Sequence, residues 1–426
     1  MVDTVVVGKS LGVEALAGVG STGSISFLII GLCTGICSGF AIPVAQKFGE
    51  RDGDGLRRFV GNMVWLGSLI ALVMTLLTTL GCRWILTAMN TPEDTFSYAY
   101  DYIFLIFLGI PATMLYNTLS GILRSLGDSR TPLLFLIFSS LLNVALDLLF
   151  VVTFKMGVAG AGWATLISQL VSGLLCLVYM AKKFPILRLS RDDLKARKLY
   201  AVRLLFMGLP MGLQYSITAI GTILLQTAVN GLGAAAMAAM TASSKVTGLF
   251  AVPFDAIGST ATTYAGQNLG AGKLARVNAG VKACALLGSI YSVVALIVLY
   301  FGAAPLSGLF LNSDEAAAAG QILPMARQLL VINAAFYIPL LFVNLLRFTI
   351  QGLGYSNLAV IAGVSEMVAR GIVALGLVPV LGFTAVCYAS PAAWVMADCF
   401  LFPAYFYCVK KRKAQYGPRA ARAGTL

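Results

Sequence analysis

The stretch PLLFLIFSSLLNVALDLLFVVT, Pro132–Thr153, is apolar almost throughout and contains one ionisable residue, Asp147. A helix of about 20 apolar residues is long enough to cross the hydrocarbon core of a bilayer. We count eleven full runs of this kind and a fragment at the start of the chain; examples are Phe59–Leu80, Trp163–Met180, Ala283–Phe301 and Phe383–Val409. The sequence therefore predicts an all-α integral membrane protein.

The composition supports this prediction. Hydrophobic residues make up 59% of the 426 positions and charged residues 11%, against about a quarter charged in soluble domains. A soluble chain with so few charges could not cover its surface, whereas lipid accepts an apolar exterior.

The positive charges indicate the orientation. A net charge of +13 would suggest nucleic acid in a soluble protein. Here nearly all loop Lys and Arg residues, Arg347 counted among them, fall on one side, and only Lys9, Arg83 and Lys155 fall on the other. Because positive loops stay in the cytoplasm, we expect a multi-pass protein of the inner membrane with a cytoplasmic C-terminus and no nucleic-acid partner.

A basic segment near the midpoint, AKKFPILRLSRDDLKARKLYAVR at Ala181–Arg203, predicts a linker between two membrane halves. We expect an amino-terminal lobe at residues 1–181, a cytoplasmic linker at 182–203, a carboxy-terminal lobe at 204–409 and a basic tail at 410–426.

The two halves resemble each other at four places, in the same order and at nearly constant spacing. The paired stretches are Leu11–Gly18 with Leu232–Ala239, Ala45–Gly49 with Gly266–Gly270, Ser125–Ser129 with Gly352–Ser356, and Gly157–Thr165 with Gly382–Ser390. Equal topology in both halves predicts a parallel repeat, an arrangement that transporters use for alternating access. The second half begins with a helix from about Arg203 to Val229, but its counterpart is only Val2–Gly8, so we expect a truncated first helix.

Asp147 is the strongest candidate for chemistry, because an ionisable residue at the centre of a membrane helix costs about 2.5–3.5 kcal/mol on insertion scales. Asn143 lies one turn before it, on the same helix face. Carboxylate and amide oxygens suit Na⁺, whereas a lone desolvated carboxylate suits H⁺. A structural hydrogen bond between helices is the alternative.

Other polar groups have simpler explanations. Glu366 and Arg370 are also one turn apart and neutralise each other, which favours a structural role. Asp255, beside Pro253, is expected to cap a broken helix. Prolines inside helices mark bends; they are Pro111, Pro210, Pro253, Pro339, Pro379 and Pro391. Four residues could line a substrate pocket, although packing is favoured for them: Tyr116, Met211, Tyr215 and Phe254.

Several functional classes are disfavoured by what the sequence lacks. It contains no histidine, so an embedded enzyme is not expected, nor any metal site other than one for Na⁺. No phosphate-binding GxxxxGK[ST] loop occurs, which argues against energy from ATP. No cofactor is expected.

The sequence resembles the multidrug and toxic compound extrusion (MATE) transporters along essentially its whole length. The resemblance rests on eight stretches: VDTVVVGKSLGVEALAGVG, SGFAIPVAQKFGERD, GILRSLGDSRTPL, NVALDLLFV, GVAGAGWAT, GLPMGLQ, AGQNLGAGK and EMVARG. It implies two six-helix lobes around a central cavity. It also implies a monomeric secondary transporter that exports drugs or organic cations in exchange for Na⁺ or H⁺.

The resemblance further implies a cation site in the amino-terminal lobe. The matching motif positions in this sequence are Asp3, Asn143, Asp147 and Thr165. Some members use acidic residues in the second lobe, but the corresponding stretches Leu209–Leu225 and Val331–Leu346 contain no acid, so we expect coupling in the first lobe. A lipid-linked precursor flippase of the same superfamily is the alternative; such proteins tend to have cationic cavities and additional helices.

Overall fold

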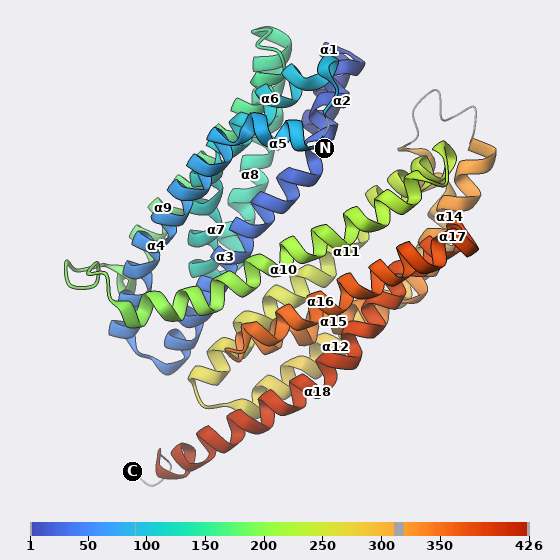
Figure 1. Ribbon diagram of the computed structural model, residues 1–426. Coiled ribbons are helices and arrows are strands. Elements are labelled where there is room, and N and C mark those ends of the chain that lie inside the picture. The colour runs from blue at the N-terminus through green and yellow to red at the C-terminus, as the bar shows by residue number, and fades with distance from the viewer. Residues whose placement is uncertain (1, 90, 311–318, 424–426) are drawn as a thin grey trace. The chain divides into compact units, whose positions relative to one another are not determined.

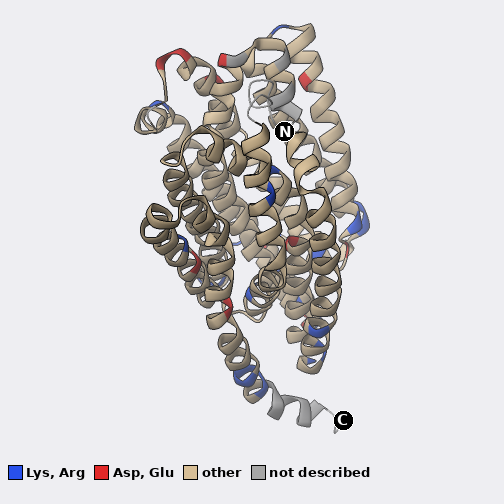
Figure 2. Cartoon of the chain, turned by 90° about the vertical axis from the view of Figure 1, so that its right-hand side faces the viewer, with Lys and Arg blue, Asp and Glu red and all other residues tan. Residues whose placement is uncertain are grey.

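The structure is a computed structural model that describes residues 2–89, 91–310 and 319–423, without the side chains of residues 2–5, 9, 13 and 416–423. All secondary structure in these ranges is helical (Figure 1). Nine of the helices are long and apolar enough to cross a membrane, and the number rises to eleven when each of two bent pairs counts as one span. Most of the helical length carries no charge (Figure 2). The predicted all-α membrane fold with eleven full spans is confirmed.

The chain divides by its internal contacts at Ser216, inside α10 (Lys198–Asn230). In the first unit, α7 is central and packs against α3, α4 and α9. The elements of this unit before α10 are α1 (Val2–Leu11), α2 (Val13–Ser21), α3 (Gly23–Glu50), α4 (Gly53–Leu80), α5 (Cys82–Ala88), α6 (Glu93–Leu108), α7 (Ile110–Ser125), α8 (Arg130–Asp147), η1 (Leu148–Thr153), α9 (Val158–Lys183) and η2 (Pro185–Leu187).

In the second unit, α15 is central and packs against α11, α12 and α18. Aromatic rings fill its core: Phe254 makes edge contacts with Tyr291 and Tyr337, at centroid distances of 5.3 and 5.4 Å. After α10 its elements are α11 (Ala234–Gly270), α12 (Leu274–Gly308), α14 (Ala319–Ala335), α15 (Tyr337–Gly352), α16 (Ser356–Ile372), η3 (Val373–Leu377), α17 (Val378–Leu381) and α18 (Phe383–Ala423).

The backbone repeats in the two units, in agreement with the predicted repeat. Pro111 and Pro339 each follow a break between two helices, where α6–α7 bends by 43° and α14–α15 by 52°. A π-helix, η1 or η3, follows α8 and α16 at equivalent places. Left-handed turns with positive φ also recur in pairs: Gly12 with Gly233, Arg51 with Gly272, Gly127 with Gly354, and Gly157 with Gly382.

Some local expectations need correction. Arg347 is not a loop residue, because it lies buried inside α15 with 5% of its surface exposed. Asp255 does not cap a broken helix, because α11 continues through Pro253. The first helix, α1, is ten residues long.

The basic segment between the halves is folded onto the first unit. After α9 ends, residues 184–197 return to α4, where the Asn62 side-chain oxygen accepts the backbone N–H of Arg197 at 2.9 Å. The indole N–H of Trp65 donates to the backbone oxygen of Leu194. Asp193 is buried in this turn. The segment therefore has a fixed structure at the end of α4.

Glycines let α3 and α10 approach each other until their backbones touch. A Cβ added at Gly35 would lie 2.6 Å from the oxygen of Met211, and one at Gly39 would lie 2.5 Å from the Cα of Gly208. Small residues at a four-residue spacing produce such close crossings between membrane helices. The crossing has no space for a side chain at these positions.

We therefore expect Gly39→Ala to destabilise the first unit, because its methyl group would collide with the backbone of α10. Gly23→Ala is the matched control, since Gly23 is on the same helix and an added Cβ there meets nothing within 4 Å. Thermal unfolding of the detergent-purified protein should show a lower midpoint for Gly39→Ala alone. Equal midpoints would contradict the close crossing.

Candidate functional site

Asp147 is the last residue of α8 and its surface is fully buried. The π-helix η1 begins at the next residue. Single π-turns are rare and often occur at functional sites, because they change the direction of the neighbouring side chains. Asp147 therefore lies where the regular helix ends. It is the only acid of the predicted site whose side chain is described.

Asn143 and Thr165 meet between α8 and α9. The Asn143 amide nitrogen lies 3.5 Å from the Thr165 hydroxyl oxygen and donates to it. One turn earlier, the Ser139 hydroxyl donates to the backbone oxygen of Ser168 at 2.7 Å. Because Ser139, Asn143 and Asp147 are spaced by four residues, they share one face of α8. This face is turned toward α9, as the two hydrogen bonds show.

Asp3 is the fourth residue of the predicted site, and its side chain lies outside the described part of the chain. Its helix can be placed. α1 contacts α8, η1 and α9, the three elements around Asn143, Asp147 and Thr165. The structure thus brings together the helices that carry all four residues.

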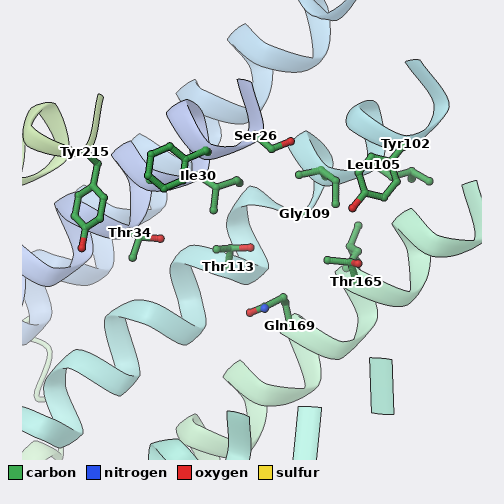
Figure 3. A pocket seen from close by; sticks show the side chains of 14 residues that line it. Ser26, Ile30, Thr34, Tyr102, Leu105, Gly109, Thr113, Thr165, Gln169 and Tyr215 are labelled. Atoms are coloured by element: carbon green, nitrogen blue, oxygen red, sulfur yellow. The ribbon is translucent and has the colours of Figure 1, made fainter. Parts of the chain in front are cut away.

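A cavity of about 460 Å³ begins beside this group (Figure 3). It lies between α3, α6, α7, α9 and the first part of α10, and its volume is in the range of about 300–1,000 Å³ that suits drug-sized ligands. Thr165 lines it together with Gln169, one turn later on α9. Thr165 is therefore shared between the predicted cation site and the cavity.

The cavity wall is apolar and aromatic, with scattered neutral polar groups. Phe27, Tyr102 and Tyr215 supply rings, and Thr34 and Thr113 supply hydroxyl groups. No charged side chain is among the residues that line it in the described part of the chain. Such a wall accepts flat lipophilic molecules and stabilises cations through ring faces.

Sequence reasoning found part of this wall. Tyr215, considered for a pocket, does line the cavity, whereas Tyr116, Met211 and Phe254 are buried in packing. It missed Gln169, although a signal was present: Gln169 follows Thr165 by four residues in the apolar run Trp163–Met180. Two polar residues on one face of such a run indicate an inward-facing stripe.

The second unit holds a buried ionic cluster around Glu366. Arg347, on α15, donates to one oxygen of Glu366, and Arg370 lies 3.4 Å from the other. All three side chains are less than 10% exposed. The predicted Glu366–Arg370 pair is present. The sequence analysis missed Arg347 as a member of this cluster because it counted this residue among the loop residues.

Comparison with known proteins agrees with these observations. The sequence profile of the MatE family matches residues 1–149 and 210–375. A protein of Bacillus subtilis strain 168 named probable multidrug resistance protein YoeA is 30% identical over 345 residues, which are 79% of this chain and 73% of the relative.

Two solved structures have the same fold. The outward-facing conformation of a multidrug resistance MATE family transporter of the MOP superfamily superposes with a TM-score of 0.88 at 21% identity, covering 97% of this chain and 92% of the other. A structure titled as the inward-facing conformation of such a transporter gives 0.71 at 21% identity, covering 97% and 93%. The profile match spans more than half of the chain. This multi-pass membrane protein therefore belongs to the MatE family, the multidrug and toxic compound extrusion transporters.

Proposed function

We propose that the protein exports drugs or organic cations in exchange for Na⁺ or H⁺ by alternating access. The observation that carries this proposal is the double role of Thr165, which accepts from Asn143 and also lines the 460 Å³ cavity. An ion bound at the polar face of α8 and a molecule held in the cavity would share this residue. A shared residue lets binding at one site act directly on the other.

Charge explains the exchange. The cavity wall has no charge of its own in the described residues. The buried carboxylate of Asp147 lies one turn after Asn143, which donates to the wall residue Thr165, so its charge acts on the cavity. With Asp147 ionised, a lipophilic cation is favoured in the cavity. Binding of H⁺ to the carboxylate, or of Na⁺ to the oxygens of Asp147, Asn143 and Thr165, removes this attraction because the interior has a low dielectric constant. Either ion would then release the substrate.

The breaks in the helices support alternating access. The α6–α7 bend lies at the cavity, since Gly109 and Thr113 on either side of Pro111 line it. A change of this bend would reshape the cavity. The parallel repeat also fits the two-lobe rocking that transporters use. In agreement with the loop charges, we place the C-terminus in the cytoplasm and the protein in the inner membrane, and we treat it as a monomer.

The flippase alternative fits the cavity less well. A lipid-linked precursor carries phosphate groups, which require cationic side chains in the binding site. None lines the cavity in the described part of the chain, and Arg347 and Arg370 are already occupied by Glu366. The second unit is thus assigned a structural ionic cluster, with coupling in the first unit.

Asp147→Asn should abolish coupled export while the protein still inserts, because Asn keeps the size of the side chain and loses the group that binds H⁺ or balances Na⁺. The measurement is ethidium efflux in everted vesicles, with Na⁺ and pH gradients imposed separately. Asp94→Asn, at an exposed acid on α6, is the control. Unchanged efflux in Asp147→Asn at equal expression would remove this residue from the mechanism.

Thr165→Ala should weaken both ion and substrate binding, whereas Thr165→Ser should retain both, because the hydroxyl group is what the two sites share. Ethidium binding to the detergent-purified protein, measured with and without Na⁺ at two pH values, tests this. A Thr165→Ala protein in which ions still displace ethidium normally would show that the two sites communicate by another route.

Glu366→Gln should lower stability before it affects coupling. The change removes the carboxylate that pairs with both Arg347 and Arg370, and breaking a buried pair in this way costs about 3–5 kcal/mol. We expect a lower unfolding midpoint and a lower yield, with near-normal efflux per folded molecule. Glu93→Gln, at an exposed site, controls for loss of a surface charge. Normal stability with abolished transport would instead assign Glu366 to the coupling mechanism.

A further inference from the structure

A second cavity, of about 560 Å³, lies in the first unit away from Thr165. Its floor is α7, which contributes Pro111, Met114 and Thr118. α4 and α9 form the two walls, and α7 packs against both. It shares no lining residue with the first cavity among the residues described. It is therefore a separate site.

This cavity opens to the apolar exterior of the unit. Val64 and Leu72 on α4 and Leu177 on α9 line it, and they are also 48%, 56% and 41% exposed. Exposed apolar side chains on membrane-spanning helices face the hydrocarbon. The opening between α4 and α9 thus leads to lipid acyl chains.

One end of the cavity is closed by the folded segment after α9 and carries positive charge. Leu187 and Leu189 line that end, and Arg188, between them, is exposed. Lys183 is exposed at the end of α9. No carboxylate of the described residues lies within 4.0 Å of either cation. Both cations are close in sequence to the residues that line this end.

Trp65 gives the depth of this end. It follows Val64 on α4, is 58% exposed, and donates its indole N–H to the same folded segment. Tryptophan is enriched at the level of the lipid headgroups, where its ring is in the apolar layer and its N–H is bonded. The positive end therefore lies at headgroup level, with the apolar cavity directed into the hydrocarbon.

We propose that this cavity binds one acyl chain of an anionic phospholipid, with the headgroup phosphate held by Arg188 and Lys183. The apolar walls match the chain, the side opening lets it enter from the bilayer, and the two unpaired cations match the phosphate. A lipophilic cation fits poorly, because the same positive charges would repel it.

The first test fills the cavity. Gly67 lines it, and a Cβ added there meets nothing within 4 Å, so the Cβ of Gly67→Leu has room and its side chain takes up part of the acyl-chain space. Gly248→Leu is the matched control, since Gly248 is also inside a long helix with open space around its Cα. Native mass spectrometry of the full chain in detergent would count bound phosphatidylglycerol. We expect one retained lipid in the natural protein and in Gly248→Leu, and loss of it in Gly67→Leu.

The second test changes the charge alone. Arg188→Gln should reduce the preference for phosphatidylglycerol over phosphatidylcholine with identical chains by about fivefold, the effect of about 1 kcal/mol for each basic residue near the membrane surface. Arg191→Gln, exposed in the same segment, should leave the preference unchanged. Because Arg188 lies in an exposed turn, this variant keeps the test informative if Gly67→Leu lowers the yield.

Three results would overturn the proposal. The first is lipid retention in Gly67→Leu equal to that of Gly248→Leu. The second is a headgroup preference that Arg188→Gln does not alter. The third is a combined result: ethidium displaces the retained phosphatidylglycerol, and Gly67→Leu loses ethidium binding and lipid binding to the same extent. That result would make the cavity a path for the transported molecule.

Discussion

Within the hydrocarbon, every backbone N–H and C=O group must be paired inside the protein, and the rest of the structure depends on this constraint. It explains why all secondary structure in the described residues is helical. It also makes each departure from a regular helix costly, so such departures occur where something compensates. The two sharp bends and the two π-helices are the main departures within the spans. The face of α8 that we propose for ion binding ends at η1, and the α6–α7 bend borders the cavity that we propose for the substrate.

The same backbone carries different chemistry in the two units. Before η1, the face of α8 holds Asn143 and Asp147, one neutral and one acidic residue. Before η3, α16 holds Glu366 and Arg370, and α15 adds Arg347. The second set is closed on itself by ion pairs, and a closed set resists the addition of an ion because a partner must first be displaced. The first set is the one to which we assign binding of H⁺ or Na⁺.

Much of the fold could be predicted from sequence, because a span of apolar residues and a repeat at nearly constant spacing are both visible in one dimension. The paired left-handed turns confirm the alignment physically: glycine occupies seven of the eight positions, and Arg51 takes the place that Gly272 has in the second half. Such a turn disfavours other residues, so glycine is retained where the backbone is repeated.

The side-chain arrangement was less predictable. In a soluble helix the apolar stripe indicates the buried face, but lipid-facing and core-facing residues are both apolar here. Leu72 is exposed and Leu56 is buried, although both are leucines of α4. Arg347 was assigned to a loop for the same reason. A single charged residue in an apolar run is taken as the end of the membrane helix unless its partner, here Glu366, is known. Tertiary pairing decides such positions, and sequence spacing does not contain it.

The position of α7 connects the two cavities of the first unit. Gly109 and Thr113, on either side of the bend, line the proposed substrate cavity. Pro111, at the bend itself, lines the other cavity. A helix that changes its angle at this point must alter both spaces together, because packed helices move as stiff bodies. An acyl chain beside Pro111 would therefore support one angle of the bend and favour one shape of the substrate cavity. In that case the surrounding lipid acts on transport through α7, the helix that lines both cavities.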